Sequence, residues 1–230
     1  METMYSRTEG LIGKEGVERL KAASVLVVGV GGVGGYAVEA LARAGVGRIC
    51  VVDSDKVAPS NLNRQIIATQ KTVGMAKVDA IMQRILDINP DCKVTAHEIF
   101  FTKECAPVLN FSEYDYILDC IDSVKSKIEL IRLAKEAGTP IISAMGAGNK
   151  LDPTRFRITD ISKTYEDPLA KVVRVELRKL GINHLKVVFS DEPPVRCGER
   201  TPMSISFIPS VMGLIMAGEV IGEIAKVGDA

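Results

Sequence analysis

Short apolar runs alternate with longer amphipathic segments along the first 145 positions of this 230-residue chain. The runs are rich in Val and Ile, as in buried strands, whereas apolar residues in the longer segments recur every three or four positions, as in helices. This alternation predicts an α/β fold, a doubly wound and mostly parallel sheet with helices on both faces. The expected strands are Ser24–Gly29, Arg48–Asp53, Lys93–Ile99, Tyr114–Cys120 and Pro140–Ala144, and the expected helices are Val33–Arg43, Gly74–Asn89 and Ser123–Ala137.

The pattern loosens after residue 145, although it still contains regular elements. We expect a strand Arg155–Ile161, a helix Pro168–Leu180, a strand Leu185–Ser190, a Pro-rich loop Asp191–Pro202 and a final helix from about Pro209. The length suits one domain over residues 1–230. We divide it into a core, 7–145, and an extension, 146–230, that carries substrate loops and dimer contacts.

Composition limits the partners and the cellular compartment that we expect for the protein. Lys and Arg total 29, and so do Asp and Glu, so net charge argues neither for nor against a nucleic-acid partner. The N-terminus has no export or transit pattern, and an odd number of cysteines without close pairs is typical of a reducing compartment, so we expect a cytoplasmic protein. The run Met203–Gly218 has 16 residues without a charge, fewer than a membrane span needs, and favours a buried or interface helix.

A glycine-rich turn follows the first expected strand. Gly29, Gly31 and Gly34 have the G-x-G-x-x-G spacing, with Gly32 between them, and Asp53 ends the next strand. Glycines at this spacing allow a tight turn and a close approach to phosphate, and a carboxylate in the second position can accept ribose hydroxyls. The unit predicts a Rossmann-like nucleotide site, and it leaves both a dinucleotide and ATP open.

Polar side chains crowd the loop that leaves the second strand. The guanidinium of Arg64 has a planar fork suited to phosphate oxygens, although a solvated loop arginine is an equal alternative. The amides could equally serve as turn residues. The candidates in this loop are Asp55, Asn61, Asn63, Arg64 and Gln65.

Two further charged residues lie where a nucleotide triphosphate would be bound. Lys77, near the start of an expected helix, could neutralise a polyphosphate, and its alternative is a solvated lysine. Asp122 follows the strand that ends at Cys120 and could hold Mg²⁺, or it could cap the helix that begins at Ser123. We interpret Asp119, within the strand end, as structural.

In this order the motifs resemble those of the ubiquitin-activating-enzyme-like adenylating enzymes, the ThiF, MoeB and HesA type. The matching segments are the glycine turn, Asp53, the segment 55–65, Val73–Lys77 and Asp119–Asp122, so the resemblance covers residues 7 to about 145. It implies that the nucleotide is ATP, with Mg²⁺, and that the reaction is adenylation of a carboxylate. It also implies a homodimer, because in this superfamily an N-terminal arginine, matched here by Arg7, reaches the γ-phosphate of the partner subunit. The implied catalytic residues are Arg7, Arg64, Lys77 and Asp122.

The last third of the chain narrows the resemblance. Activators of sulfur-carrier proteins generally contain two C-x-x-C pairs that bind zinc, but no two cysteines are three apart here, so we expect no structural zinc. Asn149–Thr154, Asp160–Thr164 and Asp167–Ala170 resemble the tRNA threonylcarbamoyladenosine dehydratases instead. That resemblance implies ATP-dependent ring closure of the threonylcarbamoyl group beside the anticodon. The alternatives are an activator of a ubiquitin-like sulfur carrier and a nicotinamide-binding or regulatory module.

A tRNA partner requires a local basic surface. The segment 154–186 contains eight Lys and Arg against four acids, and Lys171, Arg174 and Arg178 recur at helical spacing, although a solvated amphipathic helix has the same pattern. Cys197, between Arg196 and Arg200, is either an acceptor of sulfur or an incidental loop cysteine, which we favour. A sulfur-transfer partner and a monovalent cation, Na⁺ or K⁺, stay open. The candidate tRNA contacts are Arg155, Arg157, Lys163, Lys171, Arg174 and Arg178.

Overall fold

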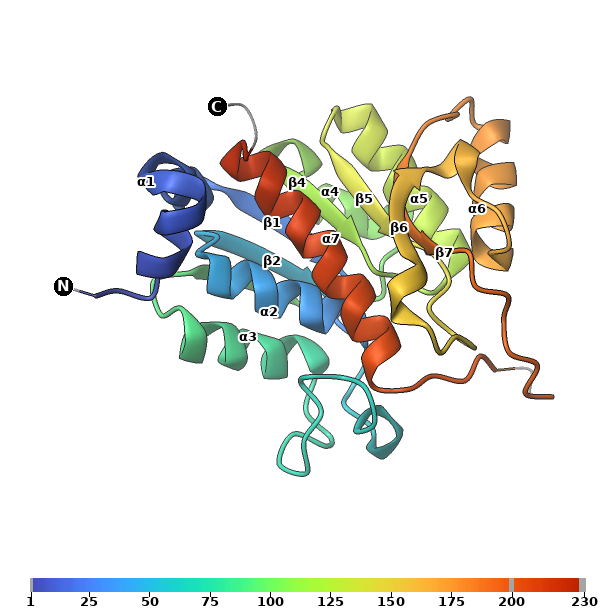
Figure 1. Cartoon of the computed structure of the whole chain (residues 1–230), viewed down its shortest axis with the longest axis horizontal. Coiled ribbons are helices and arrows are strands. Elements are labelled where there is room, and N and C mark those ends of the chain that lie inside the picture. Colours follow the sequence, from blue (N-terminus) through green and yellow to red (C-terminus); the bar gives the residue numbers. More distant parts are fainter. Residues whose placement is uncertain (1, 199–200, 228–230) are drawn as a thin grey trace.

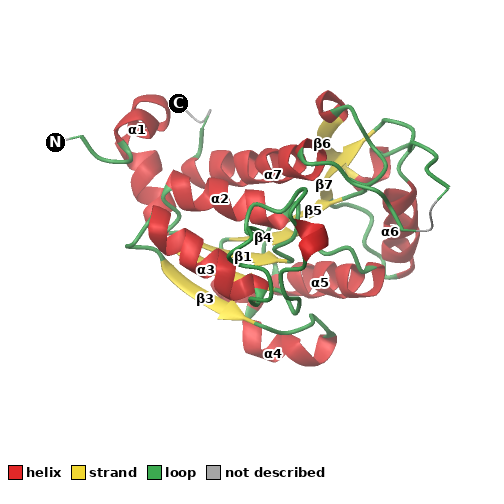
Figure 2. Cartoon of the chain, turned by 90° about the horizontal axis from the view of Figure 1, so that it is seen from below, coloured by secondary structure: helices red, strands yellow, loops and turns green. Residues whose placement is uncertain are grey.

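The computed structural model describes residues 2–198 and 201–227, and within them the chain forms three layers. A central sheet has helices on both faces, as Figures 1 and 2 show from two directions. The helices are α1 (Ser6–Ala22), α2 (Gly34–Ala44), α3 (Lys77–Ile88), α4 (Ala106–Leu109), α5 (Val124–Ala137), α6 (Pro168–Lys179) and α7 (Phe207–Ala225).

The described residues form a seven-stranded sheet in the order β3-β2-β1-β4-β5-β7-β6. All neighbouring strands are parallel except β6 and β7, which pair antiparallel at one edge. The strand order reverses between β1 and β4, and in open α/β sheets this is where ligands bind, at the carboxyl ends of the strands. The strands are β1 (Ser24–Val28), β2 (Arg48–Val52), β3 (Lys93–His97), β4 (Tyr116–Asp119), β5 (Ile141–Ala144), β6 (Phe156–Asp160) and β7 (Lys186–Ser190).

Two hydrophobic clusters cover the two faces of the sheet because successive strand residues point to opposite sides. Val25 and Val27 of β1 pack with residues of α2, α3 and α7. Leu26 and Val28 pack on the other side with residues of α5 and α6. All four side chains are buried, so β1 is the centre of the core and the loop that follows it has a rigid base.

The predicted fold class is confirmed, and β6 and β7 extend the same sheet beyond the predicted core. Two helices were not predicted, namely the single turn α4 and the longer α1. The sequence of α1 is interrupted by glycines, and its backbone is not helical at Gly13, with φ of 72°. It is held by tertiary contacts, since Arg19 Nε donates to the carbonyl of Ala225 at the end of α7 at 3.1 Å. Figure 1 shows α1 beside the amino ends of β1 and β2.

The last helix is longer than the uncharged run suggested. By length and composition α7 is the only helix of the described residues that could cross a membrane, with 19 residues and a mean hydropathy of 1.6. It lies along α2, and Ile208, Met212 and Met216 are fully buried. Its last two turns include Glu219 and Glu223, which form ion pairs with Lys186 of β7. These contacts are typical of a core helix in a folded domain.

Candidate active site

The turn after β1 requires glycine at two positions. Gly29 has a φ of +88°, and a Cβ there would lie 2.7 Å from the carbonyl oxygen of Cys120, at the end of β4. A Cβ at Gly34, the first residue of α2, would lie 1.8 Å from the carbonyl oxygen of Gly29. The turn therefore packs tightly on itself and against the carboxyl end of β4, which aims the N-terminus of α2 over the sheet edge.

The middle of the same turn has space at Gly31 but not at Gly32. A Cβ at Gly31 would have the Gln65 Nε2 atom as its nearest neighbour, at 3.5 Å, and one at Gly32 would contact Pro209 and the Cγ of Arg64. Gln65 is only 7% exposed, and its Oε1 has no hydrogen-bond partner among the described residues. A glycine cradle beside an unpaired buried amide fits a polar ligand with both donors and acceptors.

Asp53 lies over the turn from the end of β2. Its two carboxylate oxygens accept hydrogen bonds from the backbone N–H of Val30, at 2.8 Å, and of Asp55, at 2.9 Å. A carboxylate has about four acceptor positions, so both oxygens can still accept hydroxyl groups from a ligand. The contact with Val30 joins the glycine turn and the second strand into one site.

Lys77 is a buried residue of the site, and the alternative of a solvated lysine is wrong. Its side chain is 7% exposed, and its Nζ lies 2.7 Å from the Asp55 carboxylate and 3.9 Å from that of Asp53. The backbone N–H of Lys77 also donates to the carbonyl of Asp55, at 2.9 Å. The ammonium is thus fixed between two carboxylates at the edge where the glycine turn lies.

The loop between β2 and α3 is held by its own polar residues. Asn61 Oδ1 accepts from the N–H of Ala58, and Arg64 donates through Nη1 to the carbonyl of Ser60 and to Asn63 Oδ1. Asn63 Nδ2 in turn donates to the carbonyl of Ser204, at 3.1 Å, just before α7. Asn61 and Asn63 therefore have turn and bridging roles in this structure, while the stem of Arg64 lies against the glycine turn.

Asp122 lies at the carboxyl end of β4, exposed to solvent. The capping alternative is not supported, because α5 begins at Val124, its N-cap is Ser123 and no side chain caps it. Within the described residues the Asp122 carboxylate has no ion-pair or hydrogen-bond partner. An exposed carboxylate at this edge is suited to a hydrated divalent cation, which usually takes one or two protein carboxylates together with substrate phosphates.

A buried ion pair lies directly beneath Asp122, and sequence analysis found only half of it. Asp119 and Lys127 are both fully buried, with 2.7 Å between the carboxylate and Nζ. Lys127 also donates to Ser143 Oγ and to the carbonyl of Ala144, and Asp119 accepts from the N–H of Ile121. Asp119 is structural, as predicted. Lys127, eight residues later on α5, could have been suspected because an apolar helix face rarely contains a lysine without a partner.

Cys120 lies next to this ion pair, and its surroundings determine the pKa of its thiol. Burial, with a smaller effect of the adjacent Asp119 charge, raises the pKa of the Cys120 thiol far above its usual range. Its side chain packs near the position that a Cβ of Gly34 would occupy, at 3.2 Å. Cys120 is therefore a neutral packing residue under the glycine turn.

Arg7 is separated from these residues in its own chain. It is exposed on the first turn of α1, at the amino end of the sheet, whereas the glycine turn, Asp53 and Asp122 lie at the carboxyl end. Within one chain the glycine turn, Asp53 and Lys77 therefore lie together, and Asp122 follows β4 at the same sheet edge. Arg7 belongs to α1, which Figure 1 shows beside the other ends of β1 and β2.

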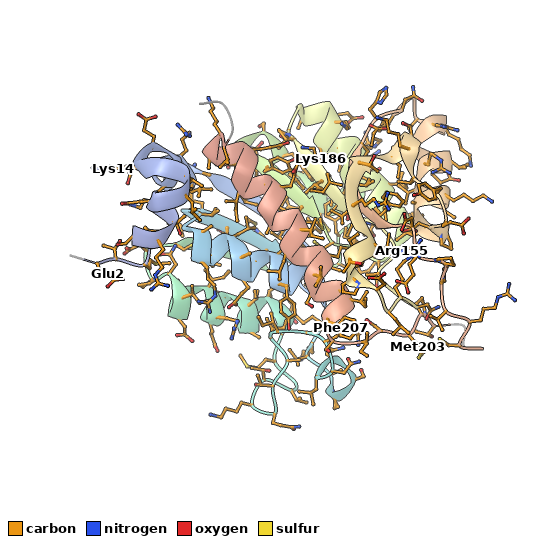
Figure 3. All side chains as sticks on the ribbon, viewed as in Figure 1. Glu2, Lys14, Arg155, Lys186, Met203 and Phe207 are labelled. Atoms are coloured by element: carbon orange, nitrogen blue, oxygen red, sulfur yellow. The ribbon has the colours of Figure 1, made fainter. Side chains whose placement is uncertain are left out.

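The candidate tRNA residues divide into two groups. Arg155 and Arg157 form ion pairs with Asp191, and Arg174 donates to the carbonyl and hydroxyl of Thr164. In Figure 3 Arg155 lies between the sheet and the loop that leads to Met203. Lys163, Lys171 and Arg178 are exposed. On α6, Val173 and Leu177 are buried, whereas Val172, Val175 and Leu180 are 45 to 49% exposed, so only part of the apolar surface of this helix packs in the core.

Cys197 lies in a loop beside a cavity of about 550 Å³. The thiol is exposed, and its nearest polar atoms are the carbonyl of Val195, at 3.6 Å, and Asn149 Oδ1, at 3.8 Å. Arg200, one of the two flanking arginines, lies outside the described residues. No group of three or more His, Cys, Asp or Glu side chains that could hold a metal occurs in the part of the chain that the structure describes.

A glycine turn, an aspartate at the end of β2 and a buried lysine lie together at one sheet edge, and this combination defines a nucleotide-binding α/β protein. The chain belongs to the ThiF family, whose model it matches over residues 5–229. Among its relatives, the tRNA threonylcarbamoyladenosine dehydratase of Bacillus subtilis (strain 168) is 48% identical over 242 aligned residues, which cover 96% of this chain and 94% of that protein. The family resemblance expected from the motifs is thereby confirmed.

Two further comparisons define how far the similarity extends. The crystal structure of Escherichia coli tRNA N6-threonylcarbamoyladenosine dehydratase, TcdA, in complex with ATP matches with a TM-score of 0.91 and 34% identity, over 97% of this chain and 94% of that one. The Aspergillus niger adenylyltransferase and sulfurtransferase uba4 is 40% identical over 133 residues, which cover 58% of this chain and 27% of that protein. Similarity to the dehydratases therefore includes the extension, whereas similarity to the sulfurtransferase is confined to part of the chain.

Proposed function

We propose that this chain catalyses the ATP-dependent cyclising dehydration of N6-threonylcarbamoyladenosine in tRNA. The observation that carries the proposal is the similarity to a dehydratase along 96% of the chain, with the candidate ATP residues gathered at one sheet edge. The substrate carboxylate attacks the α-phosphorus of ATP and expels pyrophosphate, giving an acyl-adenylate. A carbamoyl atom of the same substituent then attacks the activated carbonyl, the ring closes, and AMP leaves with one oxygen of the former carboxylate.

The glycine turn and Asp53 are proposed to hold the nucleotide. The backbone N–H groups around Gly31 and the N-terminus of α2 favour phosphate, and the open face of Gly31 allows it to approach. Asp53, already fixed by two backbone N–H groups, accepts the ribose hydroxyls. Gln65 supplies an unpaired amide oxygen to the same ligand.

Arg64 and Lys77 are proposed to disperse negative charge on the leaving pyrophosphate. Stabilisation of this kind needs cations that are already in place, because reorganisation during the reaction is costly. Lys77 meets this condition, since Asp55 and Asp53 fix its ammonium before the nucleotide binds. Arg64 has to turn its guanidinium from Ser60 toward the glycine turn, against which its stem already lies.

Asp122 is proposed to bind Mg²⁺ together with the phosphates of ATP. The fit rests on its exposed carboxylate at the sheet edge and on the rigid turn that Asp119 and Lys127 support below it. When bound, Mg²⁺ would supply positive charge for the phosphate oxygens. A monovalent cation remains a prediction of the sequence alone.

Ring closure needs little from the protein beyond orientation. The attacking atom and the activated carbonyl belong to one substituent, so the step is intramolecular and has a high effective concentration. No protein nucleophile is required. Cys197 and a sulfur-transfer partner therefore have no part in the proposed reaction.

The tRNA is proposed to contact the exposed basic residues of the extension. Lys163, Lys171 and Arg178 are exposed, whereas Arg155, Arg157 and Arg174 are engaged by Asp191 and Thr164. We therefore expect the first three to contribute more to tRNA affinity than the last three.

A homodimer is proposed because Arg7 is remote from the site of its own chain. Apolar side chains exposed near it and along α7 offer surface for a second copy, including Leu11, at 87% exposure, and Leu214, at 46%. In such a dimer Arg7 of one subunit would reach the γ-phosphate in the partner.

The function is tested by incubating the protein with ATP, Mg²⁺ and tRNA that contains the linear modification, followed by digestion and mass spectrometry of the nucleosides. We expect loss of one water mass from the modified nucleoside and formation of AMP and pyrophosphate. Asp122→Ala should abolish this turnover, while Asp87→Ala, an exposed carboxylate of α3, should not. Unchanged nucleosides, with pyrophosphate released instead on addition of a carrier protein that ends in Gly-Gly, would favour the sulfur-carrier alternative.

The dimer is tested by mixing two inactive variants. In the proposed dimer each active site takes Asp122 from one subunit and Arg7 from the other. A mixed dimer of Arg7→Ala and Asp122→Ala subunits therefore contains one intact site, and the mixture should regain part of the wild-type turnover after subunit exchange. An inactive mixture in which exchange has been demonstrated by mass would refute the cross-subunit role of Arg7.

A further inference from the structure

A second polar cavity lies at the edge of the sheet opposite the candidate active site. Its volume is about 530 Å³, and its lining contains three cationic side chains and one carboxylate. It lies between the start of α1 and the amino ends of β2 and β3. The residues on which the argument rests are Tyr5, Lys21, Arg48, Asn89, Asp91 and Lys93.

Two glycines create this cavity. Gly45, with a φ of +90°, allows the Tyr5 ring to approach, since a Cβ there would lie 2.5 Å from a ring carbon. A Cβ at Gly47 would lie 1.8 Å from the carbonyl oxygen of Lys21, so this position also requires glycine. The ring of Tyr5 in turn lies 4.7 Å from the Nζ of Lys21. The close backbone packing therefore fixes the aromatic ring and the first cation.

The other two cations are placed side by side, and neither is in an ion pair within the described residues, although the Asp91 carboxylate also lines the cavity. Arg48 and Lys93 are register partners, the first residues of the parallel strands β2 and β3. Neighbouring strands are about 4.8 Å apart, and like charges at paired positions repel each other. Both side chains are exposed, and among the described residues no carboxylate forms an ion pair with either. Lys21 differs, because Glu18 binds it at 2.8 Å.

The lining also contains an incompletely bonded amide. Asn89 is only 2% exposed, and its Oδ1 has no hydrogen-bond partner among the described residues. A buried acceptor without a partner costs about 1–3 kcal/mol. Rotation of the amide about its last torsion exchanges its two ends, so Asn89 can present either N–H donors or an acceptor to a ligand in the cavity.

We infer that this cavity binds a phosphate of the RNA backbone, and thus that the tRNA contacts the sheet edge opposite the adenylation site as well as the extension. Arg48 and Lys93 would bind the phosphate oxygens, Asn89 would bind the neighbouring ribose 2′-hydroxyl, and the Tyr5 ring would contact the sugar or base. This inference rests on the proposed function, which makes tRNA the substrate. Tyr5 is two residues from Arg7, so in the proposed dimer the cavity lies next to the N-terminal segment whose Arg7 reaches the active site of the partner subunit.

The test compares Arg48→Ala/Lys93→Ala with a control of equal charge change, Lys103→Ala/Lys135→Ala, whose lysines are exposed far from the cavity. For each protein, tRNA affinity is measured over a range of KCl concentrations, with ATP affinity and thermal stability as checks on folding. The cavity variant should bind tRNA about tenfold more weakly, and the slope of log K against log salt should fall by about 0.7–0.9 for each lost phosphate contact. Its ATP affinity and its kcat at saturating tRNA should equal those of the wild type.

A further variant and competition assays identify the ligand and separate this inference from the proposed function. Arg48→Lys/Lys93→Arg keeps both charges and should retain the affinity for tRNA. A short RNA should compete with tRNA more strongly than DNA of the same sequence or inorganic phosphate. The inference is overturned if the cavity variant and the control bind tRNA equally well, or if inorganic phosphate competes as effectively as RNA. The proposed function fails separately, if the wild type binds the modified tRNA without converting it.

Discussion

Replacement of Lys127 by methionine would leave the Asp119 carboxylate buried without its cation. Both side chains have no exposed surface, and the lysine also binds Ser143 Oγ and the carbonyl of Ala144. Methionine has a similar length, so the main change is the loss of charge and of three hydrogen bonds. The perturbation therefore removes the charge and the hydrogen bonds of the lysine at nearly constant side-chain length.

The expected cost is large compared with the stability of a folded domain. Removal of one partner of a buried ion pair typically costs about 3–5 kcal/mol, out of a total of about 5–15 kcal/mol. For a domain of this size each kcal/mol lowers Tm by about 2–4 °C, so the Lys127→Met variant should melt about 6–20 °C below the wild type. Asp119 accepts a hydrogen bond from the N–H of Ile121, next to Asp122. If Asp119 moves when its cation is lost, the turn that contains Asp122 moves with it, and ATP binding should weaken.

The measurement is guanidinium denaturation of a double-mutant cycle, with ATP titration calorimetry on each folded variant. Asp119→Leu/Lys127→Met removes both charges and should recover most of the stability, since an apolar replacement of a buried pair is often neutral. Ser143→Ala, which loses the hydrogen bond from Lys127 and the one to Asp119, should cost about 1–3 kcal/mol. A cost below about 1 kcal/mol for Lys127→Met, or no recovery in the double variant, would refute the assigned role.

Three further predictions concern packing, pH and thiol reactivity. Gly34→Ala should lower ATP affinity at least tenfold by calorimetry, because its Cβ would lie 1.8 Å from a carbonyl oxygen, whereas Gly218→Ala in α7 meets no atom within 4 Å and should leave affinity unchanged. Burial acts to raise the pKa of Glu39, but hydrogen bonds from two arginines on α2 and α3 lower it below its ordinary 4.5. The stabilising effect of the Glu39 charge is therefore present above about pH 4.5 and is lost as the pH falls through the lowered pKa. Glu39→Gln should reduce Tm at neutral pH and have no effect on Tm in acid. An equal reduction of Tm at both pH values would contradict this. Burial raises the pKa of Cys92 to about 11, so a thiol reagent at mildly alkaline pH should modify the exposed Cys197 and spare Cys92, as checked by peptide mass mapping.

Local sequence signals were sufficient for most of the candidate nucleotide site. The spacing of Gly29, Gly31 and Gly34 reflects backbone constraints within one turn, and Asp53 follows from its place at the end of the next strand. Lys77 was harder to assign, because its burial depends on Asp53 and Asp55 across the loop. The alternative of a solvated Lys77 was decided by contacts between segments, which sequence spacing does not contain. The capping alternative for Asp122 was decided by the start of α5 at Val124.

The sequence by itself determined the alternation of strands and helices, the glycine turn and the family, because these depend on residues close to one another in the chain. Only the tertiary structure decided which charges are neutralised and which remain available. Asp191 binds Arg155 and Arg157 more than thirty positions away, and the repelling pair Arg48 and Lys93 exists because β2 and β3 are neighbours in the sheet. The strand order sets these distances, and with them the electrostatics of the surface that a nucleic acid would meet.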